Sequence, residues 1–449
     1  MKNHKFRKNI IWGIIISILI IFSQENRAIP SFAHQTNLPC SSCHTIFPEL
    51  NTFGRFFKLN GYTLIGVNTI EVNDTTDKKD DVDFNLLKIP PVSLMIQAAY
   101  TYKTKEQPAT QNNNVSFPQQ LSIFFGGEIA PHLGSFIQVS YDDQEAAFGI
   151  DNIDLRYANQ TELGSENLLY GVTVNNNPTA QDLWNSTPAW GFPYASSSVT
   201  ASPLASTLIE GGLAQSVAGM GAYALLNNFL YAEFSIYRSA QQGGAHPPDN
   251  TSFGIIKTLA PYWRLAFQKQ FDDQYFEIGT FGMSTEMYPA GISGLTDRYN
   301  DFGFDINYEK SLGDNQLTAH TSFILEKRNF DATFNSNGSL SQSLNLNSFK
   351  IVGNYYLQQQ FGFTLGYFSI TGDGDAVLYA PTEFSGSSTG VPDSRGFITE
   401  IDYLPWLNTK FSVQYVAYNK FNGSGDNYDG AGRNASDNNS FYLLAWLAF

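Results

Sequence analysis

Cysteine is almost absent from this chain. The 449 residues contain two, Cys40 and Cys43, and both belong to one short motif. No disulfide framework can therefore hold the fold. Basic residues are also scarce, with 26 Lys and Arg against 41 Asp and Glu, which gives a formal net charge of −15. Such an acidic chain argues against nucleic acid as a partner and favours the attraction of cations.

Long apolar runs are equally rare, and the one that stands out lies near the start. Four basic residues, the first of them Lys2 and the last Lys8, precede a run from Ile10 to Phe22. This run is shorter than the roughly 20 residues of an ordinary spanning helix, so residues 1–28 are predicted to be a secretory signal peptide. An uncleaved membrane anchor is the alternative. Residues 1–28 hold five basic groups and one acid, so the remaining chain carries a formal net charge of −19.

Aromatic residues, by contrast, make up 15% of a chain with a mean hydropathy of only −0.21. This combination is typical of a transmembrane β-barrel, in which each strand shows lipid only alternate residues. In the segment from Val92 to Tyr102 the even-numbered residues are apolar, whereas Ser93, Gln97 and Thr101 point to the opposite face. The same alternation recurs to the end of the chain. We therefore predict an all-β fold, with residues 91–449 forming an outer-membrane porin-like β-barrel; a soluble β-sandwich or an array of β-domains is the competing architecture.

The number of strands follows from the connections. Seventeen segments alternate like strands, but a single-chain bacterial barrel needs an even number. The segment Thr251 to Leu259 breaks the alternation of short and long connections, so we assign it to a loop and predict sixteen antiparallel strands. The last segment ends on Phe449, which resembles the terminal aromatic signal of outer-membrane barrels.

The two cysteines and the next residue spell the C-x-x-C-H haem attachment pattern. Two thiols at this spacing can add to the two vinyl groups of one haem, and the adjacent histidine then reaches the iron. Cys40 and Cys43 are thus the predicted anchors of one covalent haem c, and His44 is the predicted proximal iron ligand. A C-x-x-C redox pair and half of a zinc site are the alternatives, but the sequence supplies neither a βαβ context nor four ligands.

Residues 29–62 are predicted to form a small α-helical cytochrome c module, followed by a polar linker over residues 63–90. Apolar residues at Ile46, Leu50, Phe53 and Phe57 would share one face of a short helix, with Pro48 in its first turn and a C-terminal glycine at Gly61. About 35 residues cannot cover a haem and also bury their own core. We therefore expect the module to sit in or against the mouth of the barrel.

Several stretches resemble the fused outer-membrane monohaem cytochrome c-porins, best known as the iron-oxidising type. They are Ala28 to Thr36, Cys40 to His44, Phe47 to Arg55, Asn177 to Thr179 with Trp190 to Pro193, and Ala260 to Leu265. One departure is His34, where the family motif has Arg. The resemblance implies an outer-membrane electron conduit with Fe(II) oxidase-like activity. In it, extracellular Fe(II) or another donor gives an electron to the single haem, which passes it to a periplasmic carrier such as a soluble cytochrome.

The sixth iron ligand is left open by the sequence. The candidates are His34, Met95, His320 and His132; a Met or His ligand would give a low-spin electron-transfer haem. Acidic residues on the polar strand faces could draw Fe(II) inward, although ordinary lumen charges explain them equally well. These residues are Asp154, Glu233, Asp301, Asp305, Glu309, Glu400 and Asp402.

The chain shows no catalytic dyad or nucleophile, so the haem would carry the chemistry. A diffusion porin with a haem-bearing plug or sensor, and a peroxidase-like enzyme with an open sixth position, are the alternative functions.

Overall fold

The computed structural model describes residues 31–36, 38–64, 92–107, 110–142, 147–187, 191–240, 248–406 and 408–449. The predicted signal peptide, residues 1–28, and most of the predicted linker, residues 63–90, lie outside these ranges. None of the helices within the described ranges is long and apolar enough to cross a membrane.

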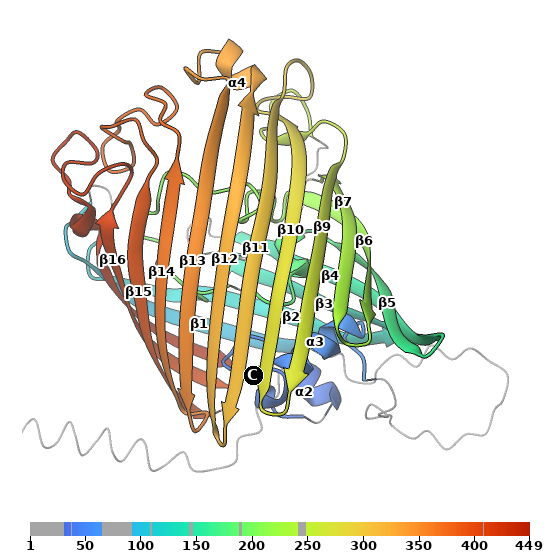
Figure 1. The fold of residues 1–449 in the computed structure, drawn as a ribbon. Coiled ribbons are helices and arrows are strands. Elements are labelled where there is room, and N and C mark those ends of the chain that lie inside the picture. Colours follow the sequence, from blue (N-terminus) through green and yellow to red (C-terminus); the bar gives the residue numbers. More distant parts are fainter. Residues whose placement is uncertain are drawn as a thin grey trace, which may run out of the picture.

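Sixteen long antiparallel strands form a closed barrel, as the sequence predicts (Figure 1). The strands are β1 (Val92–Lys103), β2 (Asn114–Ala130), β3 (Leu133–Asp142), β4 (Ala147–Leu163), β5 (Glu166–Asn175), β6 (Val217–Leu226), β7 (Leu230–Ser239), β9 (Ala260–Phe271), β10 (Gln274–Tyr288), β11 (Asp297–Leu312), β12 (Asn315–Phe330), β13 (Ser343–Leu357), β14 (Phe361–Gly372), β15 (Ser394–Trp406), β16 (Thr409–Lys420) and β17 (Ser440–Ala448). The barrel closes because β1 pairs with both β2 and β17, and the segment assigned to a loop contributes only the two-residue β8 (Ile255–Ile256).

Alternation of side chains gives the wall two chemically different faces. In β1, Ser93, Met95, Gln97 and Thr101 are buried on the inner face, as predicted. Large apolar side chains are exposed on the opposite face, among them Phe234, Leu265, Phe304, Leu365 and Ile401. An outward apolar surface on a closed barrel is the surface that a transmembrane barrel presents to lipid.

The two ends of the barrel differ in the length of their connections (Figure 1). At one end, short turns join strands such as β6 and β7, where Asn227 and Asn228 have positive φ angles of 52° and 53°. At the other end lie long loops, one of which contains α4 (Asp331–Asn335). We call these the short-turn end and the long-loop end. In outer-membrane barrels the short turns face the periplasm.

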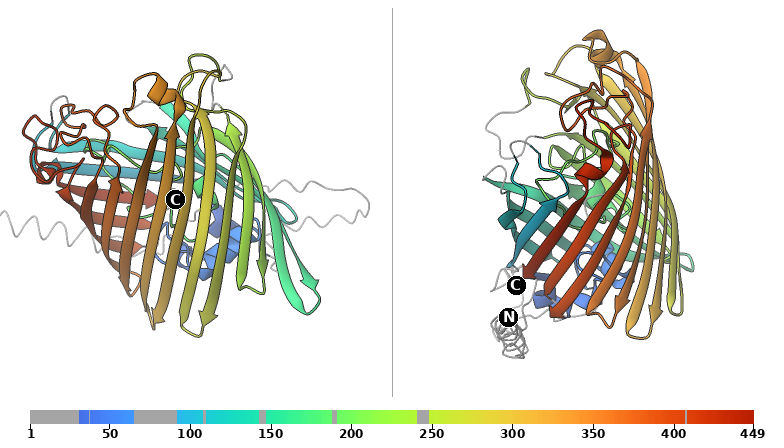
Figure 2. Two further views of the ribbon diagram at one scale, coloured as in Figure 1. Left: turned by 45° about the horizontal axis from the view of Figure 1, so that its top comes forward. Right: turned by 90° about the vertical axis from the view of Figure 1, so that its left-hand side faces the viewer.

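Two short helices lie at the short-turn end, inside the ring of strands (Figures 1 and 2). They are α2 (Ser31–Thr36) and α3 (Thr52–Leu59), and between them the one-turn 3-10 helix η1 (Cys40–Ser42) carries the cysteine motif. We call residues 31–36 and 38–64 the N-terminal module. These residues lie at the mouth of the barrel (Figure 1).

The helix after the motif begins later than the sequence predicts. Pro48 does not lie in its first turn, because residues 44 to 50 fold back on themselves through a bridge between His44 and Leu50. Asn51 then caps α3 by accepting a hydrogen bond from the backbone N–H of Gly54 at 3.0 Å. Gly61 follows the helix with a φ of 70°, as expected for a glycine at a helix C-terminus.

A long connection between β5 and β6 folds into the barrel. We call its described residues, 176–187 and 191–216, the inward loop. It begins with η2 (Pro178–Gln181), whose residues are all buried, and its backbone N–H groups at Leu208 and Ile209 donate to Glu326 and Asp301 on the strands. The lumen is therefore occupied by the inward loop as well as by the N-terminal module.

Candidate functional site

The cysteine motif is held by the helix that follows it. Asn51 donates from its side-chain amide to the carbonyl oxygens of Ser41 at 3.3 Å and Ser42 at 3.0 Å, and its backbone N–H donates to Cys43 at 2.9 Å. The helix also passes the motif at Gly54, where a Cβ atom would overlap the carbonyl oxygen of Cys43. A side chain at this position would push α3 away from the motif, which explains a glycine in the middle of a short helix.

The hydrogen bond of His44 assigns its tautomer. Its Nδ1 lies 3.1 Å from the carbonyl oxygen of Pro48, and because a carbonyl only accepts, Nδ1 must carry the proton. The lone pair is then on Nε2, the nitrogen left for a metal, and the carbonyl fixes the orientation of the ring. Burial lowers the pKa of His44, which favours the neutral, metal-binding form.

A cavity of about 490 Å³ opens next to the motif, within the range of ligand pockets in proteins. Cys40, Cys43 and His44 all line it, together with residues from the rest of the module, from β1 to β4, from β17 and from the inward loop. The structure thus brings the three predicted haem-attachment residues together on the wall of one cavity.

Aromatic rings make up much of the wall near the motif. Phe32 of α2 lies 5.2 Å from Phe57 of α3, 5.3 Å from Tyr62 and 6.1 Å from Phe136 of β3, measured between ring centroids. On the other side, Phe47 lies 5.1 Å from Trp446 of β17. Such a lining suits the flat, mostly apolar body of a haem.

The thiols do not have the properties of a redox-active pair. Burial raises the pKa of Cys40, and burial together with the neighbouring Cys40 raises the pKa of Cys43 to about 12. Redox-active C-x-x-C pairs need a lowered thiol pKa instead. Nor does any group of three or more His, Cys, Asp and Glu within the described ranges form a metal site, as structural zinc would require.

Met95 lies on the wall of the same cavity and is only 2% exposed. Its Sδ atom accepts a weak hydrogen bond from Gln97 at 3.7 Å. His34 belongs to α2, four of whose residues line the cavity, but its side chain lies outside the part of the chain that the structure describes.

The other two candidate ligands do not line this cavity. His320 on β12 contacts Asn307 through Nδ1 and Glu49 through Nε2, the latter at 2.7 Å. Both of its ring nitrogens are therefore engaged by polar neighbours. His132 lies in the turn between β2 and β3, with its ring 6.2 Å from that of Tyr157.

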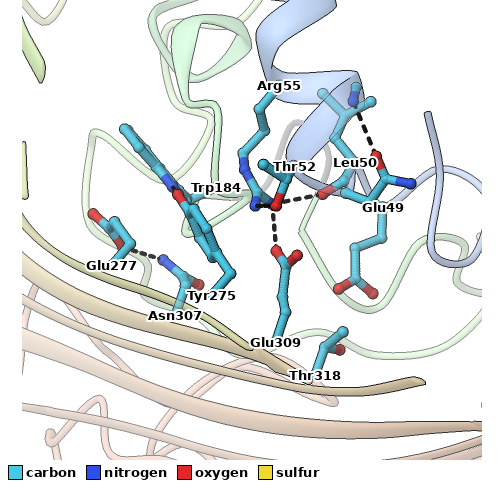
Figure 3. A network of polar contacts seen from close by, with 12 residues as sticks. Glu49, Leu50, Thr52, Arg55, Trp184, Tyr275, Glu277, Asn307, Glu309 and Thr318 are labelled. Carbon is cyan, nitrogen blue, oxygen red and sulfur yellow. Dashed lines mark hydrogen bonds and ion pairs between the residues drawn. The ribbon is translucent and has the colours of Figure 1, made fainter. Parts of the chain in front are cut away.

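On the side away from β1 to β4, the module contacts the barrel through charged groups (Figure 3). Arg55 of α3 forms an ion pair with Glu309 of β11, donates to the carbonyl oxygen of Leu50 at 2.8 Å, and lies over the ring of Tyr275 at 4.2 Å. Burial alone would favour a neutral group, but the charge of Glu309 raises the pKa of Arg55 above its ordinary value.

Glu49 occupies the centre of a second polar contact between module and barrel. Besides His320, its carboxylate accepts from Tyr194 of the inward loop at 2.9 Å and from Asn354 of β13 at 3.1 Å. Burial would raise the pKa of Glu49, but His320 and the hydrogen-bond donors hold it below its ordinary value. Sequence reasoning missed this residue because its partners lie about 145 to 305 positions away.

The acidic residues of the lumen are mostly engaged by cations or donors. Asp154 pairs with Arg156 at 2.7 Å and accepts from Tyr62 of the module at 2.6 Å, while Asp305 pairs with Arg264. These contacts support the interpretation of such carboxylates as ordinary lumen charges. Of the seven predicted residues, Asp154, Asp305 and Glu309 pair with arginines, and the other four accept hydrogen bonds from neutral donors.

The residues present fit a haem c. Two thiols at the attachment spacing, a histidine whose Nδ1 is held by the Pro48 carbonyl and an aromatic lining converge on one cavity of suitable size. The residues that would hold the group are Cys40, Cys43 and His44, with Met95 or His34 as the candidate on the opposite side of the iron.

No protein-family profile matches the chain, and no curated protein matches it either. Among solved structures, the chain is similar to an OmpT loop-deletion mutant, an outer membrane protein of Vibrio cholerae, with 9% identity over 80% of this chain and 98% of that chain and a TM-score of 0.43. It is also similar to the outer membrane channel DcaP of Acinetobacter baumannii (12% identity, 80% and 96% covered, TM-score 0.43) and to an anion-selective porin from Comamonas acidovorans (10% identity, 80% and 98% covered, TM-score 0.44). Values of this size say nothing about activity, and the description of the barrel rests on its own strand pairing.

Proposed function

We propose that this chain is an outer-membrane cytochrome-porin that carries one haem c on Cys40, Cys43 and His44. It would move electrons from an extracellular donor, with Fe(II) as the leading candidate, to a periplasmic carrier. The observation that carries the proposal is the arrangement of His44: a haem-attachment motif lies on the wall of a cavity inside a barrel, with Nδ1 held by Pro48 and Nε2 left for iron.

A haem bound there would supply a one-electron redox centre. The residues of the chain would fix its position through the two thiols, orient His44 through Pro48, and limit water through the rings of Phe32, Phe47 and Phe136. Each turnover would take one electron from the donor and give one electron to the carrier, so Fe(II) would leave as Fe(III).

The periplasmic side of the route would lie at the short-turn end. A small pocket there is lined by Cys40, by Leu404 and Asn408 near the turn between β15 and β16, and by Trp446. Cys40 thus lies close to the rim that a soluble carrier could approach.

The proposal is tested first by haem content and then by kinetics. Protein purified from outer membranes should carry one haem that survives denaturation, and Cys40→Ser with Cys43→Ser should abolish this covalent attachment. Stopped-flow mixing of the oxidised protein with Fe(II) should then produce the reduced α-band rapidly, and His44→Ala should lose it. A barrel without covalent haem would contradict the proposal, whereas haem that only dithionite reduces would contradict Fe(II) as the donor.

For the sixth ligand we propose Met95, since it is the candidate whose side chain is described on the cavity wall. A Met ligand raises the haem potential relative to a His ligand. Replacing it, Met95→His, should keep a low-spin spectrum but lower the potential. A high-spin spectrum in the unaltered protein would instead favour the peroxidase-like alternative.

A diffusion porin with a plug remains the second candidate, because the N-terminal module and the inward loop both occupy the lumen. Conductance in planar bilayers separates the two functions. Steady solute flux through the intact protein would favour the porin, and an electrically silent barrel with active haem would favour the conduit.

A further inference from the structure

The turn that orients His44 is closed at Glu49. The carbonyl oxygen that holds Nδ1 of His44, at 3.1 Å, belongs to the peptide group that joins Pro48 to Glu49. The backbone carbonyl of Glu49 in turn accepts from the backbone N–H of Thr45 at 3.0 Å. A displacement of Glu49 would therefore move the acceptor on which the ring of His44 depends.

The side chain of Glu49 is held entirely by residues outside the N-terminal module. Its carboxylate contacts His320 of β12 at 2.7 Å, Tyr194 of the inward loop at 2.9 Å and Asn354 of β13 at 3.1 Å. The residue is 1% exposed, so water cannot replace these partners. Three distant segments of the barrel thus fix one residue of the turn beside the haem motif.

His320 carries a positive charge, as its two neighbours require. Its Nδ1 lies against the side-chain oxygen of Asn307, whose amide nitrogen donates to Glu277 at 2.6 Å (Figure 3). Its Nε2 faces the carboxylate of Glu49. An amide oxygen and an ionised carboxylate only accept hydrogen bonds, so both ring nitrogens of His320 must carry protons. The contact between His320 and Glu49 is therefore a buried ion pair.

We propose that the ion pair of His320 and Glu49 is the link through which the barrel positions His44 for iron. This inference rests on the proposed function and adds a positioning residue to it: His320 acts on the haem ligand from the barrel wall and is not itself a ligand. A buried ion pair is costly to break, so it restrains the turn firmly. A well-held acceptor at Nδ1 makes the imidazole a better electron donor, which lowers the potential of a haem that it binds.

The test removes each charge of the pair in the haem-loaded protein. Glu49→Gln keeps the size of the side chain, and His320→Gln leaves a neutral donor toward Glu49. Each variant should raise the midpoint potential by about 59 mV, which is a tenfold change in the equilibrium constant for one electron. The backbone N–H of Thr45 should also exchange with solvent roughly tenfold faster, because its acceptor lies on the loosened turn.

The signs of the two shifts separate positioning from a direct effect of charge. By charge alone, loss of the carboxylate raises the potential and loss of the imidazolium lowers it, so the double variant Glu49→Gln with His320→Gln would return to the original value. Positioning predicts that both single variants shift in the same direction and that the double variant equals either one. Opposite shifts that cancel, or no shift in either single variant, would overturn the proposal.

Glu210→Gln is the matched control. It removes one charge of another buried ion pair in the lumen, that with Lys350, which includes no residue of the turn. The potential and the exchange of Thr45 should both stay as they are. A shift equal to that of Glu49→Gln would assign the effect to the net charge of the lumen and overturn the proposal.

The proposed function can fail separately. If the purified protein carries no covalent haem, that function is contradicted, and exchange of the Thr45 amide in the unaltered protein and the three variants of the pair still decides the inference. Faster exchange in both single variants, with no further increase in the double variant, would support positioning of the turn by the barrel. Equal exchange in all four proteins would overturn it.

Discussion

The N-terminal module is held by two walls of the barrel that use different chemistry. On the side of β2 and β3 the contacts are rings and bare backbone, with Phe32 against Phe136 and against Gly126. On the side of β10 to β13 they are charged, with Arg55 on Glu309 and Glu49 on His320. The first wall borders the cavity beside the cysteine motif, and the second lies behind α3 (Figure 3).

This difference explains how a small segment can be fixed in position and at the same time shielded from water. Apolar contacts exclude water but are not directional, so by themselves they allow the module to slide. Buried ion pairs are directional, and each is costly to break because a lone charge then remains in a poorly hydrated site. The charged wall thus sets the register of the module, and the ring-lined wall forms the site.

The largest effect is expected on the charged wall. Arg55→Met should destabilise the docking of α3 by about 3–5 kcal/mol, since Glu309 would stay buried without its cation. The measurement is hydrogen exchange of the α3 amides in the intact barrel. The double variant Arg55→Met with Glu309→Leu should recover most of the loss. If the double variant were as unprotected as the single one, the ion pair would not be the source of the effect.

On the ring-lined wall, Phe32→Ala should destabilise the docking of α2 by about 2–3 kcal/mol. This is less than the loss for a fully buried ring, because Phe32 is only partly buried. The loss should appear as faster exchange of α2 amides and as lower covalent haem content. High salt should weaken the ion pairs of the charged wall only modestly, because they are buried. It should not weaken the ring contacts of Phe32. Identical salt dependence of the two variants would contradict the division into two walls.

A smaller effect is expected from a larger side chain on β2 at the position where α2 packs against it. Gly126→Ala would place a Cβ atom 2.8 Å from the ring of Phe32, and such overpacking costs about 1–3 kcal/mol. Gly149→Ala on β4 is the control, since a Cβ atom there meets nothing within 4 Å. Equal protection of α2 in the two variants would mean that the ring moves aside without cost.

The smallest effect concerns the inward loop and depends on pH. Glu210 pairs with Lys350 at 2.6 Å, and although burial would raise the pKa of Glu210, Lys350 lowers it below the ordinary 4.5. A carboxyl with a lowered folded-state pKa stabilises the fold fully above about pH 4.5 and loses this contribution as the pH falls through the lowered value. Proteolysis of the loop should therefore speed up below pH 4.5, by the equivalent of about 1 kcal/mol. Glu210→Gln should remove this pH dependence; an unchanged dependence would assign it to another group.

Much of the barrel could be predicted from the sequence, because the alternation of inward-facing and outward-facing residues in a strand can be seen within a few neighbouring residues. The alternation around Val92 to Tyr102 predicts which side chains of β1 face inward. The alternation of short and long connections correctly excludes the segment from Thr251 to Leu259 from the long strands. The haem motif is local as well, since the three attachment residues lie within five positions. The helix start was predicted too early, because the spacing of apolar residues does not reveal that residues 44 to 50 form a turn.

The sequence by itself therefore determined the strand faces, the number of long strands and the residues that could attach a haem. Only the tertiary structure decided what surrounds them: that Met95 lines the cavity and His320 does not, that Glu49 joins three distant segments, and that a bulge brings Asp151 to the wall of the same cavity. The physical reason is the separation along the chain of the residues that determine each feature. Periodicity and thiol spacing are fixed by the geometry of a few neighbouring residues, whereas the closure of sixteen strands around a module and a loop brings together side chains that are more than 300 positions apart.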